Sequence, residues 1–379
     1  MDKKVAVLIG TRPGIIKMAP LVHELEKRDA ECVLIHSGQH YSANMDRQIM
    51  EDVELGDPDY HIERPEDSVT HAQQTAYMLT HIEDALMESE TDVLLVCGDA
   101  NTNLAGALAA RKIHVTVGHV EAGLRSFDWR MPEEHNRVMI DHISEYLFAP
   151  TEITRDHLAD DGVQGDVFVV GNTIVDSTLK YAERIPDDVD SQIDELTGGD
   201  PYILLTSHRE ENVDDPEVLE RVLSVVDQIG CERDLTVVFP AHPRTQKRIE
   251  EFGLQDTVDG FEKMRIVDPF QYRQFLGFLK NAEFVITDSG GIQEESCILQ
   301  VPCITIREST ERPETVDVGA NQVAGTVPAD IRAAVNKLTD RATAWPNPYG
   351  DGKTSQRIID TCLHGEPRDE FTAPQVATK

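Results

Sequence analysis

The sequence lacks several motifs that would point directly to a cofactor or a metal. It has no G-x-G-x-x-G turn after a predicted strand, which argues against a nicotinamide dinucleotide, and no G-x-x-x-x-G-K-[ST] phosphate loop. Its six cysteines form no C-x-x-C pair and show no zinc spacing, so we expect reduced thiols and no bound metal. The chain also lacks internal repeats and low-complexity tracts. No cofactor is therefore expected.

Basic residues and long apolar runs are scarce. The chain has 35 Lys and Arg against 69 Asp and Glu, a formal charge of −34. This charge argues against nucleic acid and anionic membranes as partners. Because the acids are spread along the chain, we expect a solvated acidic surface, as in proteins of a high-salt cytoplasm. No apolar run is long enough for a signal peptide or a membrane span, so a cytoplasmic location is expected.

The chain, at 379 residues, is long enough for two domains. Short apolar runs alternate with helical patterns, which predicts an α/β fold with parallel sheets covered on both faces. The predicted strands are 5–10, 33–36, 92–99, 115–120, 146–149 and 167–170 in the first half, and 202–206, 235–240, 265–267, 284–287 and 303–306 in the second. An acidic, glycine-containing segment suggests a domain junction between about residues 171 and 200. We therefore predict domains 1–172 and 173–353, then a helix from 354 and a disordered tail up to 379.

The stretch from Thr287 to Ser296 is typical of a strand, a glycine turn and the start of a helix. Backbone N–H groups at such a turn, together with the helix dipole, form an anion site, and Gly290 and Gly291 permit close approach of a phosphate. Glu294 or Glu295, about one turn into the helix, would suit a ribose. A capped turn without a ligand would show the same residues, so this stretch alone leaves both interpretations open.

Polar side chains follow the predicted strands in both halves of the chain. They include Arg12, Asp99, Glu121, His208, Arg209, His242 and Ser289. Ligands of open parallel sheets bind beyond these strand ends, so we expect the groups to collect in a cleft between the domains. Each has a simpler alternative role: Asp99 would suit a helix cap, and Glu133 would suit a cap or a pair with Arg137. Asp99, Glu121, Glu133 and His208 together form a set of acid/base candidates.

A series of short motifs carries a resemblance to one family. In order along residues 4–365 they include Gly10-Thr11-Arg12-Pro13, Gly98-Asp99, Gly118-His119-Val120-Glu121-Ala122-Gly123-Leu124-Arg125, Pro132-Glu133-Glu134, Gly171-Asn172-Thr173, His208-Arg209-Glu210, Thr287 to Glu295, and Thr310-Glu311-Arg312-Pro313-Glu314. In these motifs the chain resembles the non-hydrolysing UDP-N-acetylglucosamine 2-epimerases. The resemblance implies two Rossmann-type domains that face each other across a cleft (GT-B-like), with the last helix returning to the first domain.

The resemblance also implies an activity and a set of site residues. The activity is interconversion of UDP-GlcNAc and UDP-ManNAc in a homodimer, by anti elimination of UDP to 2-acetamidoglucal and syn re-addition, for surface polysaccharide or glycoprotein sugars. The implied catalytic residues are Asp99, Glu121, Glu133 and His208. The implied UDP-binding residues are Arg12, Lys17, Arg209, His242, Phe275, Ser289, Gly290, Gly291, Glu295 and Arg312.

The chain departs from the family pattern in a few places, and other activities stay open. Gly14 stands where the family usually has Glu, and the segment from Ser126 to Arg130 is shorter than in some bacterial members. These differences leave open whether substrate activates the enzyme at a second site. A hydrolysing epimerase that releases UDP and ManNAc, a glycosyltransferase of the same fold and a non-catalytic nucleotide-sugar binder are alternatives. The sequence does not show which carboxylate acts as base.

Overall fold

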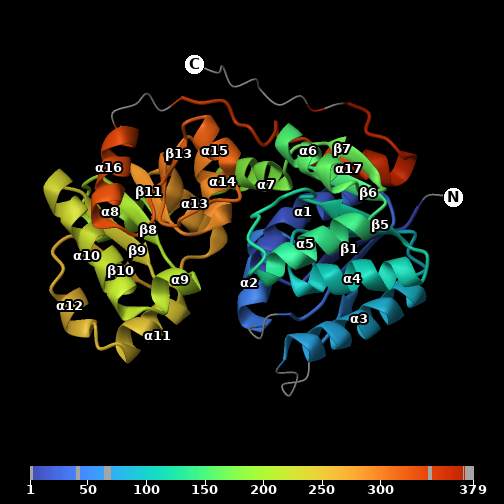
Figure 1. The fold of residues 1–379 in the computed structure, drawn as a ribbon, viewed down its shortest axis with the longest axis horizontal. Coiled ribbons are helices and arrows are strands. Elements are labelled where there is room, and N and C mark those ends of the chain that lie inside the picture. Colours follow the sequence, from blue (N-terminus) through green and yellow to red (C-terminus); the bar gives the residue numbers. More distant parts are fainter. Residues whose placement is uncertain (1–2, 40–42, 64–69, 340–343, 370, 372–379) are drawn as a thin grey trace. The chain divides into compact units, whose positions relative to one another are not determined.

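The protein consists of two compact units, each built around one parallel sheet (Figure 1). The structure is a computed structural model that describes residues 3–39, 43–63, 70–339, 344–369 and 371. The first unit comprises residues 1–177 with 349–374, and the second comprises 178–348 with 375–379. The predicted fold class, two Rossmann-type parallel-sheet domains, is confirmed. The predicted disordered tail lies, from residue 372 onward, outside the described residues.

The sheet of the first unit has the strand order β3-β2-β1-β4-β5-β6-β7, with every pairing parallel. Its strands are β1 (Val5–Ile9), β2 (Cys32–His36), β3 (Tyr60–His61), β4 (Val93–Cys97), β5 (Thr116–Val120), β6 (Tyr146–Ala149) and β7 (Asp166–Val169). The order reverses between β1 and β4, so the segments that follow these strands diverge to opposite sides. Such a switch point is where open α/β sheets bind ligands.

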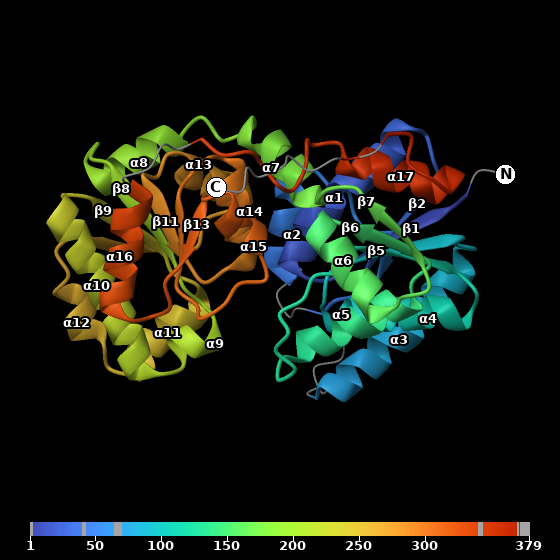
Figure 2. The ribbon, with the colours of Figure 1, turned by 45° about the horizontal axis from the view of Figure 1, so that its top comes forward.

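Helices cover both faces of this sheet (Figure 2). They are α1 (Arg12–Lys27), α2 (Ala43–Asp52), α3 (His71–Glu88), α4 (Asn101–Lys112), α5 (Pro132–Ile143), α6 (Glu152–Asp161) and α17 (Thr354–His364). Alternate strand residues such as Leu8 and Leu94 pack with α3, α4 and α5 in one core cluster. Helix α17 packs against α1, although the two are far apart in sequence. Helix α7 (Thr173–Ala182) contains the boundary between the two units.

The second unit repeats this design with six strands in the order β10-β9-β8-β11-β12-β13. Its strands are β8 (Tyr202–Thr206), β9 (Thr236–Pro240), β10 (Met264–Val267), β11 (Phe284–Thr287), β12 (Cys303–Thr305) and β13 (Asn321–Val323). Its helices are α8 (Val189–Thr197), α9 (Glu210–Val213), α10 (Pro216–Arg233), α11 (Pro243–Glu251), α12 (Gln255–Asp259), α13 (Tyr272–Lys280), α14 (Gly290–Ile298), α15 (Pro313–Asp317) and α16 (Pro328–Thr339). The order reverses between β8 and β11, so His208 and Ser289 follow the two strands at this switch point.

The two faces of this second sheet bury separate apolar clusters. On one face Ile203, Val237 and Ile286 pack with α10 and α16, and on the other Leu204 and Val285 pack with α8 and α13. Both sets of alternating strand residues are fully buried, which explains why the strands read as continuous apolar runs.

Two helices begin earlier than their apolar pattern predicts. The pattern at 136–144 places the start of α5 at Asn136, but the helix starts at Pro132, so Glu133 lies in its first turn. Helix α1 likewise starts at Arg12, ahead of the apolar pattern at 15–25 that predicts it. Pro13 is compatible with a first turn, and Thr11 caps the helix by accepting a bond from Gly14 N, 3.2 Å. Among the described residues, no helix is long and apolar enough to cross a membrane.

Candidate functional site

Two of the predicted acids follow neighbouring strands of the first unit. Asp99 comes two residues after β4, and Glu121 comes directly after β5. Glu121 has a backbone φ of +68° and a side chain that is only 5% exposed. A non-glycine residue in this left-handed conformation costs about 1–3 kcal/mol and persists only where its surroundings enforce it. The turn therefore directs the Glu121 side chain into a fixed, buried position.

Glu121 accepts two short bonds in this buried position. Its Oε1 lies 2.5 Å from Lys17 Nζ of α1 and 2.8 Å from Asn172 Nδ2, and both donors are buried. Its Oε2 lies 3.8 Å from Cys97 Sγ. A buried carboxylate is stable as an anion only when it is paired and bonded in this way. The structure thus places Lys17, predicted for the UDP site, beside a catalytic candidate, and it adds Asn172, which the sequence did not single out as a site residue.

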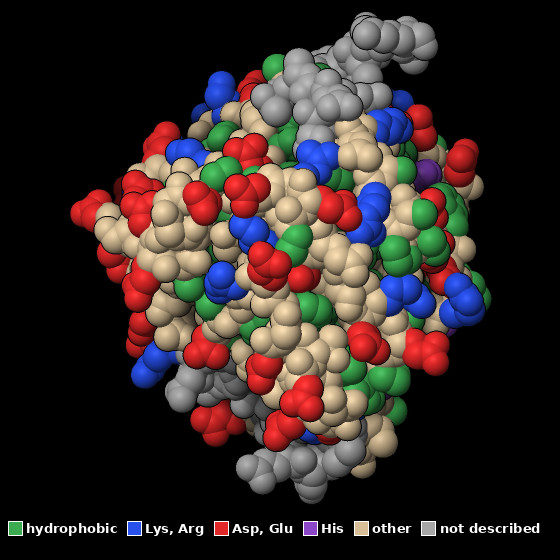
Figure 3. Space-filling model, turned by 90° about the vertical axis from the view of Figure 1, so that its left-hand side faces the viewer, with side chains coloured by type: hydrophobic (Ala, Val, Ile, Leu, Met, Phe, Trp, Pro, Cys, Tyr) green, Lys and Arg blue, Asp and Glu red, His purple; other side chains and the backbone are tan. Residues whose placement is uncertain are grey.

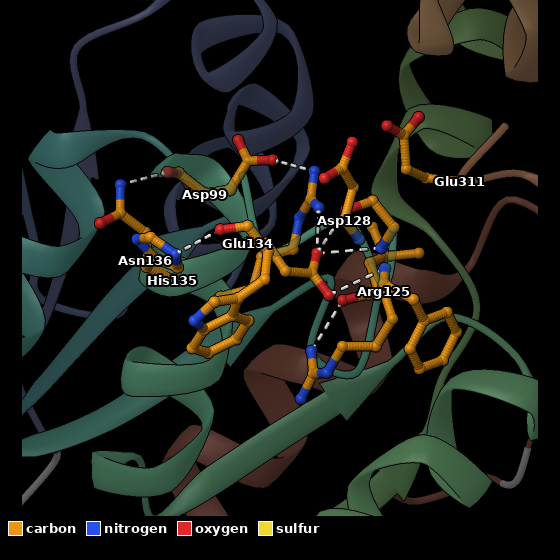
Figure 4. A network of polar contacts seen from close by, with 12 residues as sticks. Asp99, Arg125, Asp128, Glu134, His135, Asn136 and Glu311 are labelled. Atoms are coloured by element: carbon orange, nitrogen blue, oxygen red, sulfur yellow. Dashed lines mark hydrogen bonds and ion pairs between the residues drawn. The ribbon is translucent and has the colours of Figure 1, made fainter. Parts of the chain in front are cut away.

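Asp99 forms an ion pair with Arg137 of α5 (Figure 4). The same guanidinium donates to Glu134 Oε2, 2.7 Å, and Asn136 Nδ2 donates to the backbone oxygen of Asp99, 2.8 Å. Helix α4 has Ala100 at its N-cap, with no side-chain capping bond, so Asp99 is not the cap of this helix. The Asp99 side chain is 35% exposed, and it therefore combines a fixed orientation with access to solvent or a ligand.

The two neighbouring glutamates of α5 differ sharply. Glu133 is exposed in the first helical turn, and the structure gives it no hydrogen bond or ion pair among the described residues. Glu134 is buried and accepts bonds from Ser126 N, 2.9 Å, and Phe127 N, 3.1 Å, besides Arg137. Burial alone would raise the pKa of Glu134, but these donors outweigh it and lower the pKa. Glu134 therefore anchors the 126–127 segment, and Glu133 is available for chemistry.

Arg12 lies at the first position of α1, where the helix dipole favours anions. Burial lowers the pKa of its guanidinium, and the nearby Asp46 carboxylate opposes that shift. With Thr11 as the N-cap, the turn after β1 combines an arginine with the N–H groups of a helix start. This arrangement suits a phosphate.

In the second unit, His208 is held by a buried aspartate. Its Nδ1 lies 3.0 Å from Asp288 Oδ1, and Asp288 Oδ2 accepts from the backbone N of His208, 2.9 Å, and of Arg209, 3.0 Å. Asn212 Nδ2 donates to the same oxygen, 3.0 Å. Burial would raise the pKa of Asp288, but these donors, with His208 foremost, lower it to about 2. The imidazole is 41% exposed, so Asp288 fixes a ring whose other nitrogen can face a substrate.

The ring of His242 lies beside that of His208, with centroids 5.9 Å apart. His242 is the N-cap of α11, and its Nδ1 accepts a bond from Arg244 N, 3.2 Å. A ring nitrogen that accepts from a backbone N–H carries no proton, so the other nitrogen of His242 carries it. The pair thus offers two imidazoles at the ends of β8 and β9.

The turn after β11 has the features expected of an anion site. Ser289 is the N-cap of α14 and makes no side-chain capping bond. A Cβ added to Gly290 or Gly291 would meet no atom within 4 Å, and neither glycine has a positive φ. Neither packing nor backbone conformation therefore requires glycine here, and the open space leaves the backbone N–H groups accessible to a ligand.

The remaining predicted UDP residues lie around this turn in sequence or on neighbouring elements. Glu295 is buried in α14, and burial together with this carboxylate raises the pKa of Tyr272 well above its ordinary value. Arg312 is buried, with Nε 2.5 Å from Glu294 Oε1. Phe275, on α13, packs against the apolar cluster of the sheet face. Among the residues that the structure describes, no cluster of His, Cys, Asp or Glu is arranged to hold a metal ion.

Comparisons with known proteins point to one family. Residues 23–363 match the profile of the family described as UDP-N-acetylglucosamine 2-epimerase. The chain is 47% identical over 367 residues to the UDP-N-acetylglucosamine 2-epimerase of Methanocaldococcus jannaschii, covering 96% of this chain and 100% of that protein. It is 46% identical over 369 residues to the enzyme of that name from Methanococcus maripaludis, covering 96% and 99%. The crystal structure of the M. jannaschii enzyme in complex with UDP-GlcNAc and UDP matches with a TM-score of 0.88 at 46% identity, covering 96% and 100% of the two chains.

Proposed function

Because the chain belongs to the UDP-N-acetylglucosamine 2-epimerase family, we propose that it interconverts UDP-GlcNAc and UDP-ManNAc without hydrolysis. The observation that supports this most is the pair of acids at the ends of β4 and β5. Asp99 is partly exposed beside Arg137, whereas Glu121 is buried beside Lys17. Inversion at C2 needs a proton to leave one face of the sugar and return to the other, so at least two acid/base groups in different settings are required.

The proposed reaction is an elimination followed by a re-addition. A carboxylate of the first unit takes the C2 proton while the C1–O bond breaks and its electron pair leaves with UDP. The electrons of the C2–H bond form the C1–C2 double bond of 2-acetamidoglucal. In the re-addition step, UDP attacks C1 of the glucal, and an acid delivers a proton to the opposite face of C2. Asp99, Glu121 and Glu133 are the proposed acid/base residues of these two steps.

The second unit is the proposed UDP site. The negative charge that develops on the leaving diphosphate needs donors already in place. The N-terminus of α14, with Ser289, Gly290 and Gly291, presents such donors, and the ring of His208 is oriented by Asp288. Arg12 and Lys17, with Arg209, His242, Phe275, Glu295 and Arg312, complete the proposed binding set. A homodimer in the cytoplasm that supplies surface polysaccharide or glycoprotein synthesis is the setting that we propose.

Incubation with UDP-GlcNAc in D₂O at high KCl tests the proposal. We expect UDP-ManNAc with deuterium at C2, and deuterium in the recovered UDP-GlcNAc. Release of UDP and free sugar would indicate a hydrolysing enzyme instead, and no change without an added acceptor would point to a glycosyltransferase. The Glu121→Gln variant should not incorporate deuterium. Replacement of the exposed Asp84 by Asn is a matched control, because it removes one carboxylate from the surface of α3.

A further inference from the structure

Beneath the turns that carry Asp99 and Glu121 lies a buried aspartate on α5. Resting on the proposed function, we propose that Asp141 is a positioning residue. It holds the backbone beside Asp99 and Glu121 in place through His119 and Gly123. Asp141 itself contacts neither acid in a hydrogen bond that the structure records, so its effect is exerted through the backbone.

Asp141 is fully buried and uses both carboxylate oxygens. Its Oδ1 lies 2.6 Å from His119 Nδ1. Its Oδ2 accepts from Gly123 N, 3.2 Å, and lies 2.7 Å from the Arg125 guanidinium. A buried carboxylate that loses one of these donors would be left under-bonded, so the three contacts form one unit.

His119 carries the connection to Asp99. It is fully buried on β5, and its Nε2 lies 3.1 Å from the carbonyl oxygen of Gly98. A carbonyl can only accept, so Nε2 donates to Gly98 O. Gly98 directly precedes Asp99, has a φ of +73° and donates through its own N to Val120 O, 3.0 Å. The ring therefore fixes the peptide from which the Asp99 side chain departs.

Gly123 carries the connection to Glu121. It lies two residues further along the same turn and has a φ of +81°. A Cβ at this position would lie 2.1 Å from Thr154 O, so the backbone packs directly against α6. Because Glu121 also has a positive φ, the turn departs from extended geometry at two of three positions. The bond from Gly123 N to Asp141 holds the turn in that unusual shape.

Helix α5 connects these contacts, because it carries several of the residues involved. Glu133, Arg137 and Asp141 are spaced four residues apart, which places them along one face of the helix. The first is itself a proposed acid, the second pairs with Asp99, and the third holds both strand-end turns. Helix α5 therefore holds or carries all three acids of the proposed reaction.

A purely structural role for Asp141 predicts something different. If the network only stabilises the core, a folded variant should show a lower unfolding temperature with an unchanged kcat. If Asp141 positions the two acids, the folded variant should have a lower kcat. Its affinity for UDP should stay constant, because the proposed UDP-binding groups of the second unit are untouched. A displacement of about 1 Å at reacting groups lowers turnover by about 100-fold.

The test compares the full-length wild type with Asp141→Asn, His119→Gln and the surface control Asp84→Asn in molar KCl. We expect Asp141→Asn to lower kcat about 100-fold, with KM and the calorimetric UDP affinity within about twofold. Amide hydrogen exchange should increase in the peptides that contain Gly98 and Gly123. His119→Gln keeps an amide donor for Gly98 O and leaves the bond from Gly123 N to Asp141 in place, but it removes the contact of Asp141 Oδ1 with the ring. It should therefore raise exchange in both peptides less than Asp141→Asn does.

The outcomes separate this inference from the proposed function. Folded Asp141→Asn with wild-type kcat, or with unchanged exchange in both turns, would overturn the positioning role. Should Asp141→Asn not fold, the same criteria apply to His119→Gln, which retains the charge of Asp141. A wild type that does not epimerise UDP-GlcNAc would instead overturn the proposed function, and the exchange measurement would still decide whether Asp141 holds the two turns.

Discussion

The buried pair of Lys17 and Glu121 yields the sharpest prediction of stability. Lys17 Nζ lies 2.5 Å from Glu121 Oε1, with side chains 7% and 5% exposed. Replacing Lys17 by Met keeps most of the volume of the side chain but removes the positive charge. Glu121 then remains a buried carboxylate that still accepts from Asn172 Nδ2, 2.8 Å away. The variant should therefore be destabilised mainly by the loss of the positive charge beside this carboxylate and only slightly by lost packing.

The size of the effect follows from burial. Removal of one partner of a buried ion pair costs about 3–5 kcal/mol, and the retained bond from Asn172 places Lys17→Met near the lower end, about 3 kcal/mol. Replacing both partners, in Lys17→Met with Glu121→Gln, removes the charge as well as its partner. The double variant should recover to within about 1 kcal/mol of the wild type, because Gln can still accept from Asn172. The double variant should then be about 2–3 kcal/mol more stable than Lys17→Met alone.

The two tryptophans allow the first unit to be followed by itself. Trp129 lies in the first unit and Trp345 in the second, so a Trp345→Phe background leaves a fluorophore only in the first. Urea unfolding in molar KCl, followed by Trp129 fluorescence and by hydrogen exchange of β5, would yield the free energies of unfolding. The reasoning is refuted if Lys17→Met loses less than about 1 kcal/mol, or if the double variant is no more stable than the single one. The affinity of Lys17→Met for UDP would test the predicted binding role separately.

Three further predictions concern the other acids. Because the pKa of Asp288 is lowered to about 2, the ionised carboxylate contributes about 2 kcal/mol of stability above its unfolded pKa of about 4, and this contribution is lost as the pH falls toward 2. In urea, Asp288→Asn should have a lower free energy of unfolding than the wild type at pH 6. A difference between the two proteins that persists at pH 2 contradicts this. Glu133→Gln should abolish turnover and keep its free energy of unfolding within about 0.5 kcal/mol of the wild type. Glu134→Gln should lose about 1–3 kcal/mol of stability in thermal unfolding. Equal losses of stability in the two variants would contradict the different roles of the two glutamates. Acids are scattered over the face of the molecule drawn in Figure 3, and the net charge is −34. We therefore predict that Tm rises between about 0.1 M and 1 M KCl, as the Debye length falls from about 10 to 3 Å, and a flat Tm would refute it.

The fold was predictable because each strand carries its own local signal. Runs such as Val5–Ile9 and Phe284–Thr287 have an apolar or β-branched residue at every position, since both faces of these sheets are covered. The two-residue strand β3 and the three-residue strand β13 went unpredicted, because such short edge strands carry almost no pattern. The start of α5 was missed because Pro132 and the two glutamates after it do not extend the apolar helical pattern, although proline followed by acids is typical of a first helical turn.

The candidate site was predictable in its positions but not in its bonds. Residues that follow strands at a switch point are recognisable from the order of the chain alone. The partners are not, because Lys17 and Glu121 are 104 positions apart and His208 and Asp288 are 80 apart. Only the strand order brings such residues together, and strand order is a property of the whole sheet. The role of Asp141 was invisible for the same reason, since an aspartate within a helix gives no sign of being fully buried.

Bonding, rather than residue type, distinguishes the proposed acids Asp99 and Glu133 from the acids that support the fold. The proposed acid Glu121 is the exception, because it is buried and bonded to Lys17 and Asn172. Asp288, Asp141 and Glu134 are buried, and donors bond both oxygens of Asp141 and of Glu134. For Asp288, Oδ2 accepts from the backbone of His208 and Arg209, and Oδ1 lies 3.0 Å from the His208 ring. Protonation of such a carboxylate would sacrifice bonds that keep a neighbouring turn or ring in place, so these acids are suited to orientation. Glu133 is exposed, and Asp99 is partly so beside Arg137, as the proton exchange with a bound sugar that we propose for them requires. Two glutamates adjacent in sequence, Glu133 and Glu134, therefore differ in the roles that we propose for them, because only Glu134 points into the protein.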